Sequence, residues 1–288
     1  MEGKLFVVAT PIGNMGDISL NGIQALNNSH LILAEDTRVS KVLLNRYKIN
    51  TPMISYHKYN ENYRVDWIVK QWEQGKHISL ISDAGTPCIS DPGAIIVSHA
   101  VKCGVPVMGV PGPSAMITAL SISGFSYNSF AFYGFLPRDK SKCKEMWKEV
   151  LNNGSDIVIL YESPKRIMAT ISMIGEYLYD SNICLCNDLT KKYERIYRGT
   201  ASSLLEELRE NISYDKGEYT VVIQKNKGFT QDKEQEQSQS LESMLVDIII
   251  KQKVTIKESI NILNKNLPNI SKKEIYAASL NFKDILQN

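Results

Sequence analysis

The first 110 residues repeat one pattern, in which a short apolar run is followed by a loop and a helix-like segment. The apolar runs, rich in β-branched residues, occupy residues 4–9, 31–35, 78–82 and 106–110. Such alternation predicts βαβ units built around a largely parallel sheet. Ligands of these sheets bind in the loops at the carboxyl ends of the strands. The Gly/Pro-rich segments of this sequence follow its predicted strands.

The pattern restarts after about residue 135 with shorter connections, which predicts a mixed sheet in a second α/β domain. Its expected strands are 156–161, 182–187, 195–198 and 218–224, and its expected helices are 140–151, 165–178 and 202–210. A polar Gln/Glu/Lys-rich linker follows, and then three short helices at 241–251, 255–264 and 271–281, the last opened by a Ser271/Glu274 capping box. We therefore predict an N-terminal α/β domain (1–135), a C-terminal α/β domain (136–225), a linker (226–240) and a helical extension (241–288).

Composition excludes several classes of protein. Hydrophobic residues make up 43% of the 288 residues and the net charge is only +2, so any nucleic-acid surface has to be local. No apolar stretch is long enough to span a bilayer, which predicts no membrane association. The five cysteines show no CxxC pairing, which argues against a disulfide framework and a zinc site and indicates the cytoplasm. Cys184 and Cys186 alternate along a predicted strand and are expected to be small core residues on one face.

Three loops carry the strongest sign of a binding site. The segment SDAGTPCISD (82–91) follows one strand, GVPGPSA (109–115) another and TPIGNMGD (10–17) the first. Each alone is compatible with an ordinary turn, and Asp91 is expected to cap the next helix, opened by Pro92–Gly93. Three such loops after strands of one sheet predict a shared cleft. GxGxxG after the first strand, GxxxxGK[ST] and HExxH are all missing, and the four histidines are isolated, so no metal site is expected.

Charged residues also cluster at the end of the second predicted strand, in AEDTR (34–38), and in YHKYNENYR (56–64). A solvated helix start explains Glu61 and Arg64 equally well. Basic residues concentrate at 138–148, 165–166 and 191–192, where exposed helix faces are the simpler interpretation. Lys165–Arg166 differs, because SPKR begins a predicted helix, where a cation is unfavourable unless an anion offsets it.

Read together, these motifs are similar to those of the tetrapyrrole methylase superfamily, and within it to the branch that methylates a cytidine ribose of bacterial 16S rRNA. The matching segments are LFVVATPIGN (5–14), AEDTR (34–38), SDAGTPCISDPG (82–93), GVPGPSA (109–115), YGFLPR (133–138), YESPKR (161–166), LTKKYE (189–194) and KGEYT (216–220). The resemblance covers about the first 225 residues, and the helical extension also fits the rRNA branch.

The resemblance implies two α/β domains of tetrapyrrole-methylase type, with S-adenosylmethionine in the cleft between them, and a homodimer. The implied substrate is a cytidine in the decoding region of 16S rRNA within the small ribosomal subunit, methylated at its ribose 2′-hydroxyl without a metal. Carried over by position, the cofactor contacts are Pro11, Asp83, Ala84, Gly85, Thr86, Ser114, Ala115 and Glu162. The residues expected to contact RNA are Arg38, Arg138, Lys165, Arg166, Lys191 and Lys192.

The acid–base group is assigned more loosely. Asp36 closes a buried strand beside Arg38, which can hold it ionised, so Asp36 is the first candidate to accept the hydroxyl proton. His57 has the better unperturbed pKa for this task, and with Glu61 it is expected to assist.

One position departs from the family pattern, and three alternative functions stay open. Asn187–Asp188 stand where the family usually has Arg-Glu, which puts a role at 187 in doubt and weakens one at 188. A precorrin-type tetrapyrrole methyltransferase shares the fold, but should lack SPKR, LTKKYE and the C-terminal helices. A diphthine synthase fits AEDTR and SDAGTP poorly. A non-catalytic RNA-binding assembly factor is separated by whether the protein binds S-adenosylmethionine.

Overall fold

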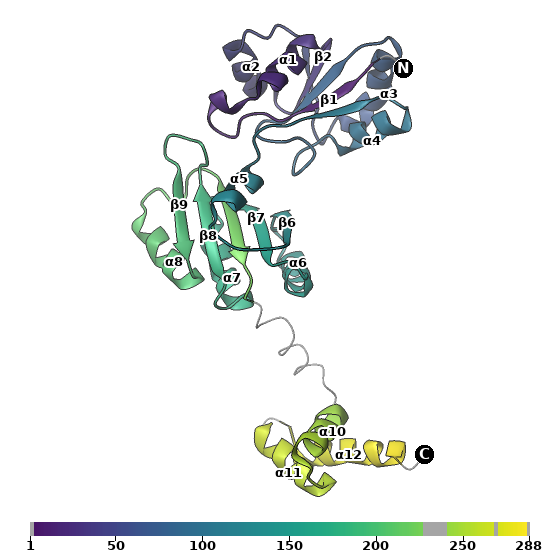
Figure 1. Cartoon of the computed structure of the whole chain (residues 1–288), viewed down its shortest axis with the longest axis vertical. Helices are drawn as coiled ribbons and strands as arrows, with labels where there is room; N and C mark the ends of the chain where they lie inside the picture. Colours follow the sequence, from purple (N-terminus) through teal and green to yellow (C-terminus); the bar gives the residue numbers. More distant parts are fainter. Residues whose placement is uncertain (1–2, 227–240, 268–269, 287–288) are drawn as a thin grey trace. The chain divides into compact units, whose positions relative to one another are not determined.

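The computed structural model describes residues 3–226, 241–267 and 270–286 (Figure 1). They form two compact units, one within residues 1–226 and one within 227–288. The predicted linker, apart from residue 226, lies outside the described residues. Within the described part of the chain, no helix has the length and apolarity needed to cross a membrane.

The first sheet is parallel throughout, as the alternating pattern predicts. Its strands are β1 (Leu5–Val8), β2 (Leu31–Ala34), β3 (Met53–Ser55), β4 (Ile78–Ile81) and β5 (Val107–Val110), in the order β3-β2-β4-β1-β5. Every residue of β2 and β4 is buried, because helices cover both faces of the sheet.

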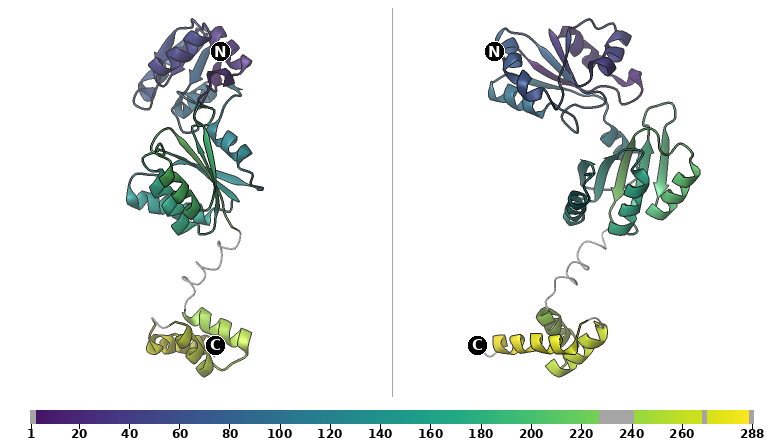
Figure 2. Two further views of the ribbon diagram at one scale, coloured as in Figure 1. Left: turned by 90° about the vertical axis from the view of Figure 1, so that its left-hand side faces the viewer. Right: turned by 180° about the vertical axis from the view of Figure 1, so that it is seen from behind.

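Helices α1 (Leu20–Asn28) and α2 (Thr37–Arg46) lie on one side of this sheet, and α3 (Glu61–Glu73) and α4 (Ala94–Lys102) on the other (Figures 1 and 2). A short 3-10 helix, η1 (Met15–Asp17), precedes α1. Each face has its own core: Leu26, Leu43 and Leu44 pack on one side, and Ile68, Trp72 and Ile96 on the other.

The second sheet is mixed, also as predicted. Its strands are β6 (Phe130–Phe135), β7 (Ile157–Glu162), β8 (Asn182–Asn187), β9 (Arg195–Gly199) and β10 (Tyr219–Gln224), in the order β6-β7-β10-β8-β9. Only the β6–β7 pair is parallel among these strands.

Helices cover both faces of this sheet as well. On one face pack α6 (Lys140–Asn152), α7 (Ile167–Tyr177) and α8 (Ala201–Glu210), through a core that includes Trp147, Ile171 and Leu204. The other face packs against α5 (Ala115–Ile122), which joins the two sheets. Cys184 and Cys186 lie in this second core with their Sγ atoms 3.8 Å apart, which confirms that they are small buried residues on one face.

The structure corrects three details of the sequence interpretation. Strand β6 pairs with β7, so the division at residue 135 separates it from its own sheet; the four-part domain division otherwise stays a prediction. Asp91 does not cap α4, because the loop runs on to Gly93, which is the N-cap. Helix α7 begins at Ile167 rather than at residue 165, because Ser163–Arg166 form a turn.

The C-terminal unit is a three-helix cluster of α10 (Leu241–Gln252), α11 (Ile256–Asn266) and α12 (Lys272–Leu286). Among the described residues, its buried hydrophobic core consists of Leu245, Ile260, Leu263, Ile275 and Ala278. The predicted capping box is confirmed, since Ser271 N–H donates to Glu274 Oε2 (2.9 Å) and Glu274 N–H to Ser271 Oγ (3.3 Å).

Candidate active site

The three Gly/Pro-rich loops of the first sheet are bonded to one another. Because β1, β4 and β5 are adjacent and parallel, their carboxyl ends meet at one edge. Thr10 N–H donates to the Gly85 carbonyl (2.9 Å), and Gly85 N–H to the Thr10 carbonyl (3.1 Å). Thr86 Oγ1 donates to the carbonyl of Pro113 in the third loop (3.2 Å). These bonds fix the loops as one surface.

That surface borders a cavity of about 350 Å³, whose other walls come from the second sheet. A cavity of this size is within the range of small-molecule sites. The three Gly/Pro-rich loops contribute Ile12, Ala84, Gly85, Thr86, Ile89, Ser90, Asp91, Ser114 and Ala115. The second domain contributes Phe135, Tyr161, Glu162, Ser163, Pro164, Leu189, Lys191, Glu218, Tyr219 and Thr220.

The cavity brings together most of the residues expected to contact the cofactor. Those that line it are Ala84, Gly85, Thr86, Ser114, Ala115 and Glu162, whereas Pro11 and Asp83 are next to lining residues but do not line it themselves. Sequence reasoning did not single out the walls at Phe135, Tyr161, Leu189 and Glu218–Thr220. The signal was present, because these residues fall in YGFLPR, YESPKR, LTKKYE and KGEYT.

At the start of α5 the cavity meets backbone donors. The N-cap residue Ser114 makes no side-chain capping hydrogen bond. The first N–H groups of a helix have no partner within the helix, and here one of them, that of Met116, donates to Tyr161 Oη (3.2 Å). An anionic or carbonyl group in the cavity can accept from the other N–H groups at this end of α5, where the helix dipole favours negative charge.

Glu162 is fully buried at the opposite wall, with all its acceptor positions in use. Its Oε1 accepts from Ser163 N–H (2.7 Å), and its Oε2 accepts from Thr170 Oγ1 (2.7 Å) and lies 3.4 Å from the Arg166 guanidinium. The carboxylate thus holds the turn between β7 and α7. It is also the anion that offsets the cation at the start of α7.

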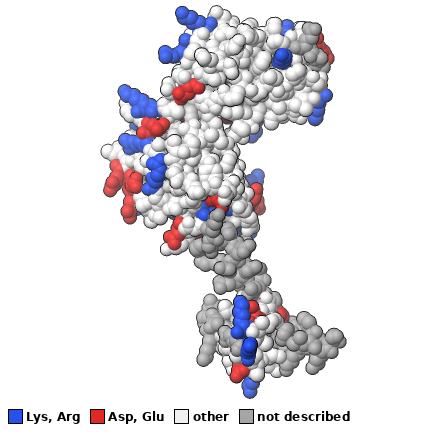
Figure 3. Space-filling model, in the orientation of Figure 1, with Lys and Arg blue, Asp and Glu red and all other residues white. Residues whose placement is uncertain are grey.

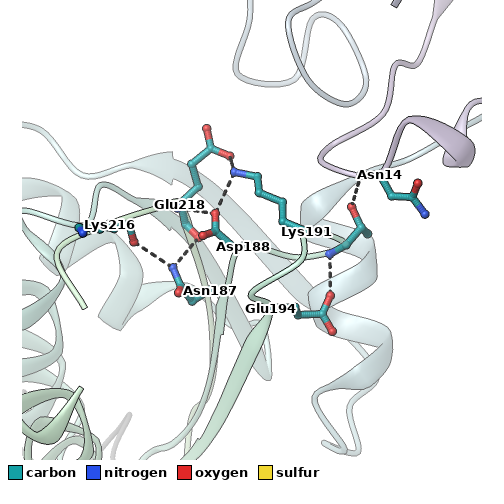
Figure 4. Close-up of polar contacts among 8 residues, drawn as sticks. Asn14, Asn187, Asp188, Lys191, Glu194, Lys216 and Glu218 are labelled. Carbon is teal, nitrogen blue, oxygen red and sulfur yellow. Dashed lines mark hydrogen bonds and ion pairs between the residues drawn. The ribbon is translucent and has the colours of Figure 1, made fainter. Parts of the chain in front are cut away.

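Lys191 lines the cavity. It belongs to a charged network with Asp188 and Glu218 (Figure 4). Its ammonium donates to Asp188 Oδ1 (2.8 Å) and Glu218 Oε2 (2.9 Å). Burial alone would lower the pKa of Lys191, but its hydrogen bonds to the carboxylates of Asp188 and Glu218 outweigh burial and raise this pKa. Lys191 therefore stays charged and in place.

The same network accounts for the departure from the family pattern at 187–188. Asn187 is buried, and its amide donates to the carbonyls of Lys216 (3.3 Å) and Glu218 (3.4 Å), so a neutral side chain serves the turn before β10. Asp188 still reaches Lys191, and its backbone adopts a left-handed φ of 53°. Nearby, Asn14 N–H donates to Thr190 Oγ1 (3.0 Å), which joins the first loop to the second domain.

Acidic residues near the cavity differ in how readily they accept a proton. Hydrogen bonds from Arg38 lower the pKa of Asp36 to about 2. Burial, together with the negative charge of neighbouring acids, raises the pKa of Glu35 and of Asp91. Asp91 lines the cavity. In the part of the chain that the structure describes, no three His, Cys, Asp or Glu side chains form a metal-binding group.

The three residues predicted for catalysis lie away from the cavity lining. Asp36 is the N-cap of α2, where Oδ1 accepts from Arg38 N–H (2.8 Å). His57 is in the turn before α3, and its N–H donates to Asn60 Oδ1 (2.8 Å). Glu61 is the first residue of α3. Asp36 is linked to the cofactor loop, because its N–H donates to Asp83 Oδ1 (3.0 Å).

The residues predicted to contact RNA have several kinds of surroundings. Arg38 is ion-paired with Asp36, and Lys192 lies 5.3 Å from the Tyr193 ring centre. Lys165 is exposed, whereas Arg166 donates to the carbonyls of Leu136 and Pro137. On the face of residues 3–226 shown in Figure 3, Lys and Arg are interspersed with Asp and Glu. Arg138 and Arg166 line a separate cavity.

Comparisons with known proteins place this chain. Residues 4–205 match the family model "Tetrapyrrole (Corrin/Porphyrin) Methylases". The chain is 39% identical over 280 residues to "Ribosomal RNA small subunit methyltransferase I" of Bacillus subtilis, covering 96% of this chain and 94% of that protein. A protein of the same name from Thermotoga maritima is 38% identical over 221 residues, which cover 77% of this chain and 98% of the relative.

Two solved structures share the fold at low sequence identity. A uroporphyrin-III-C-methyltransferase from Thermus thermophilus aligns with a TM-score of 0.53 and 17% identity, over 78% of this chain and 93% of that one. The cobalt precorrin-4 methyltransferase CbiF aligns with a TM-score of 0.56 and 16% identity, over 77% and 95%. The two sheets, the loop-lined cavity and the matched family model lead to one conclusion: this chain belongs to the tetrapyrrole methylase family.

Proposed function

We propose that this protein is an S-adenosylmethionine-dependent methyltransferase that acts on 16S rRNA of the small ribosomal subunit. The target that fits best is the ribose 2′-hydroxyl of a cytidine in the decoding region. The observation that carries the proposal is the 39% identity, over nearly the full length of both chains, to a relative named for small-subunit rRNA methylation. The cavity supports the methyl-transfer part of it.

The lining of the cavity suits S-adenosylmethionine, which combines a flat base, ribose hydroxyls and a charged amino-acid end. Apolar surface comes from Ile12, Ile89 and Leu189, while Thr86 and the N-terminus of α5 provide polar partners. Ala84, Gly85 and Ala115 have no bulky side chain and leave the backbone accessible. We assign Ala84–Thr86 and Ser114–Ala115 to cofactor binding and give Glu162 a positioning role. Pro11 and Asp83 would act through the loops that they support.

When bound, S-adenosylmethionine supplies an electrophilic methyl group on its sulfonium. The contribution of the protein is to align the acceptor hydroxyl and to take its proton. Asp36 is the weaker base, because its bonds to Arg38 keep its pKa at about 2. Asp91 borders the cavity, and burial raises its pKa. We therefore assign to Asp91 the role of accepting the hydroxyl proton. The neighbouring Glu35 also has a raised pKa. His57 and Glu61 would support the substrate side.

The remaining parts of the proposal concern partners and place. Exposed cations, among them Arg38, Lys165 and Lys192, would contact rRNA phosphates, whereas Lys191 acts at the rim of the cavity. Arg138 and Arg166 would contact RNA from the separate cavity that they share. A cytoplasmic location follows from the proposed substrate, which is a cytoplasmic ribonucleoprotein particle. The proposal also includes a homodimer, which the family resemblance implies.

The experiment that tests the function combines the purified protein with labelled S-adenosylmethionine and small subunits that lack the modification. Label should enter the 16S rRNA, and mapping should place it on one cytidine ribose. Calorimetry with the cofactor alone provides a separate measurement. Cofactor binding without label in the RNA would contradict the proposed substrate, and absence of cofactor binding would contradict the enzyme itself.

A further inference from the structure

A second cavity, of about 380 Å³, lies between α6 and α7 and the turn that precedes α6. Lys140, Lys144 and Trp147 of α6 line it together with Arg138 of the turn. Arg166, at the start of α7, and Tyr177, at its end, complete the wall. Neither the family model nor the names of the relatives assign a role to it.

The cavity is strongly cationic. Four of its lining residues, Arg138, Lys140, Lys144 and Arg166, are positively charged, and no carboxylate lines it among the residues described. Arg166 is paired with Glu162. Within the described chain, the other three side chains form no ion pair, and the nearby Asp139 carboxylate caps α6 through Lys142 N–H. At least three charges are therefore available to an anion.

The inner wall is aromatic. The rings of Trp147 and Tyr177 are stacked, with centroids 5.4 Å apart and an angle of 5° between planes. Trp147 is fully buried, yet its indole N–H has no hydrogen-bond partner among the described residues. A buried donor without a partner is costly and uncommon.

We propose that this cavity binds a nucleotide segment of single-stranded RNA, outside the methyl-transfer cavity. Phosphates would lie on Arg138, Lys140 and Lys144, and a base or ribose would cover the aromatic wall at Tyr177, the ring of the pair that is partly exposed. Cations beside aromatic surface are the combination by which proteins bind single-stranded nucleic acid. An acidic peptide would satisfy the charges, but would leave the aromatic wall uncovered.

This site deepens the proposed function and rests on it for the identity of the RNA. Arg166 connects the two cavities, because its guanidinium lines the second one and is 3.4 Å from Glu162, which lines the first. RNA held at the second cavity would therefore lie close to the methyl-transfer cavity. The site would serve to hold the substrate during transfer.

The first test measures binding of a short fluorescein-labelled single-stranded RNA by anisotropy over a range of salt concentrations. The Lys140→Gln/Lys144→Gln variant removes two charges from the cavity. By the single-strand slope of about 0.7 per phosphate contact, its salt slope should fall by about 1.4 and its affinity at about 0.1 M salt by about 25-fold. The control, Lys102→Gln/Lys142→Gln, removes two exposed charges, one from α4 and one from α6 outside the lining. Equal losses in both variants would overturn the site.

The second test observes the cavity itself. The protein has three tryptophans, so the Trp147 indole N–H resonance can be assigned by its disappearance in Trp147→Phe. Saturating RNA should shift this resonance. RNA that binds without moving it, or an oligoglutamate that moves it equally, would overturn the proposal. If Trp147→Phe unfolds, Trp67→Phe and Trp72→Phe assign the other two indole resonances and so identify that of Trp147 by elimination.

The outcomes of these tests distinguish a failure of the proposed RNA site from a failure of the proposed function. Wild-type protein that binds RNA through the cavity but does not methylate small subunits would contradict the function and leave the site standing. The opposite outcome has two parts: Lys140→Gln/Lys144→Gln methylates subunits normally at limiting substrate, and RNA does not shift the Trp147 resonance. This outcome would contradict the site and leave the proposed function supported.

Discussion

At the scale of single residues, neighbours decide which acid is basic enough to accept a proton. Asp36 and Asp91 follow different strands of the same sheet, yet Arg38 lowers the pKa of one while burial raises that of the other. A group with a higher pKa accepts a proton more readily, provided that it is ionised at the working pH. Only Asp91 of the two lines the cavity.

We therefore expect Asp91→Asn to lower single-turnover methylation by about 10²-fold, the lower range for a positioned base. Asp36→Asn should change it far less. In wild-type protein the rate should fall as the pH drops through the raised pKa of Asp91, because the carboxylate is then protonated. Rapid-quench assays on small subunits measure both. A larger loss in Asp36→Asn than in Asp91→Asn would show that Asp36 is the proton acceptor.

Gly85 tests the cofactor loop. Its φ of +82° is in the left-handed region, and a Cβ would stand 3.4 Å from Ile12 Cγ2 at the cavity wall. Gly85→Val should abolish S-adenosylmethionine binding in calorimetry, because the branched side chain occupies ligand space and strains the loop. Gly104→Val is the matched control, since Gly104 has a φ of +68° and open space around it. If the two variants bind the cofactor equally well, the loop assignment is wrong.

Single residues also show where sequence reasoning stops. The loops that line the cavity were predictable, because Gly and Pro after a strand indicate an irregular backbone. The partners of charged side chains were not. Arg166 was predicted to contact RNA, which stays a prediction, but its pairing with Glu162, four residues earlier in the chain, was not predicted. Such a pairing depends on the bend of the turn, which the sequence pattern does not specify.

At the scale of elements, the turn between β7 and α7 depends on this pair. Arg166 donates to the carbonyls of Leu136 (2.9 Å) and Pro137 (3.4 Å) and is 3.4 Å from the buried carboxylate of Glu162. Removing the guanidinium leaves that carboxylate with fewer partners. Arg166→Ala should lower the free energy of unfolding by about 1.5–3 kcal/mol, the range for hydrogen bonds to charged groups.

Urea denaturation measures this change, and Lys165→Ala is the control. Lys165 is exposed, so its loss should stay within about 0.5 kcal/mol. Equal effects of the two substitutions would show that the Arg166 pair adds little to stability.

The elements missed from the sequence share a position in the fold. Both β3 and β6 are edge strands, the first in the order of their sheets. An edge strand has one neighbour and less burial, which weakens its apolar pattern, although the other two edge strands, β5 and β9, were predicted. β3 has three residues, none fully buried, and β6 is interrupted by a register shift between Phe132 and Gly134. The central strands β2 and β4, buried throughout, were predictable because their apolar runs are continuous.

At the scale of the whole molecule, the two units have separate cores of unequal size. Among the described residues, the first unit contains four buried hydrophobic clusters around two sheets, whereas the C-terminal unit has one, with five buried hydrophobic residues. All residues that line the first cavity belong to the larger unit. The Thermotoga maritima relative is matched over 98% of its length by only 77% of this chain. A protein of that name can therefore be about as long as the first unit alone.

This comparison decides what removal of the C-terminal unit should do. A chain ending at Asn226 should fold and bind S-adenosylmethionine with an affinity within about twofold of that of the full chain. The reason is that every residue that lines the cofactor cavity belongs to the first unit. Since a relative of that length bears the same name, the expected loss is in the KM for small subunits rather than in kcat. Steady-state assays at varied subunit concentration separate the two. A fall in kcat with unchanged KM would mean that the helical unit acts on the transfer step, and a loss of cofactor affinity would mean that the first unit is not self-sufficient.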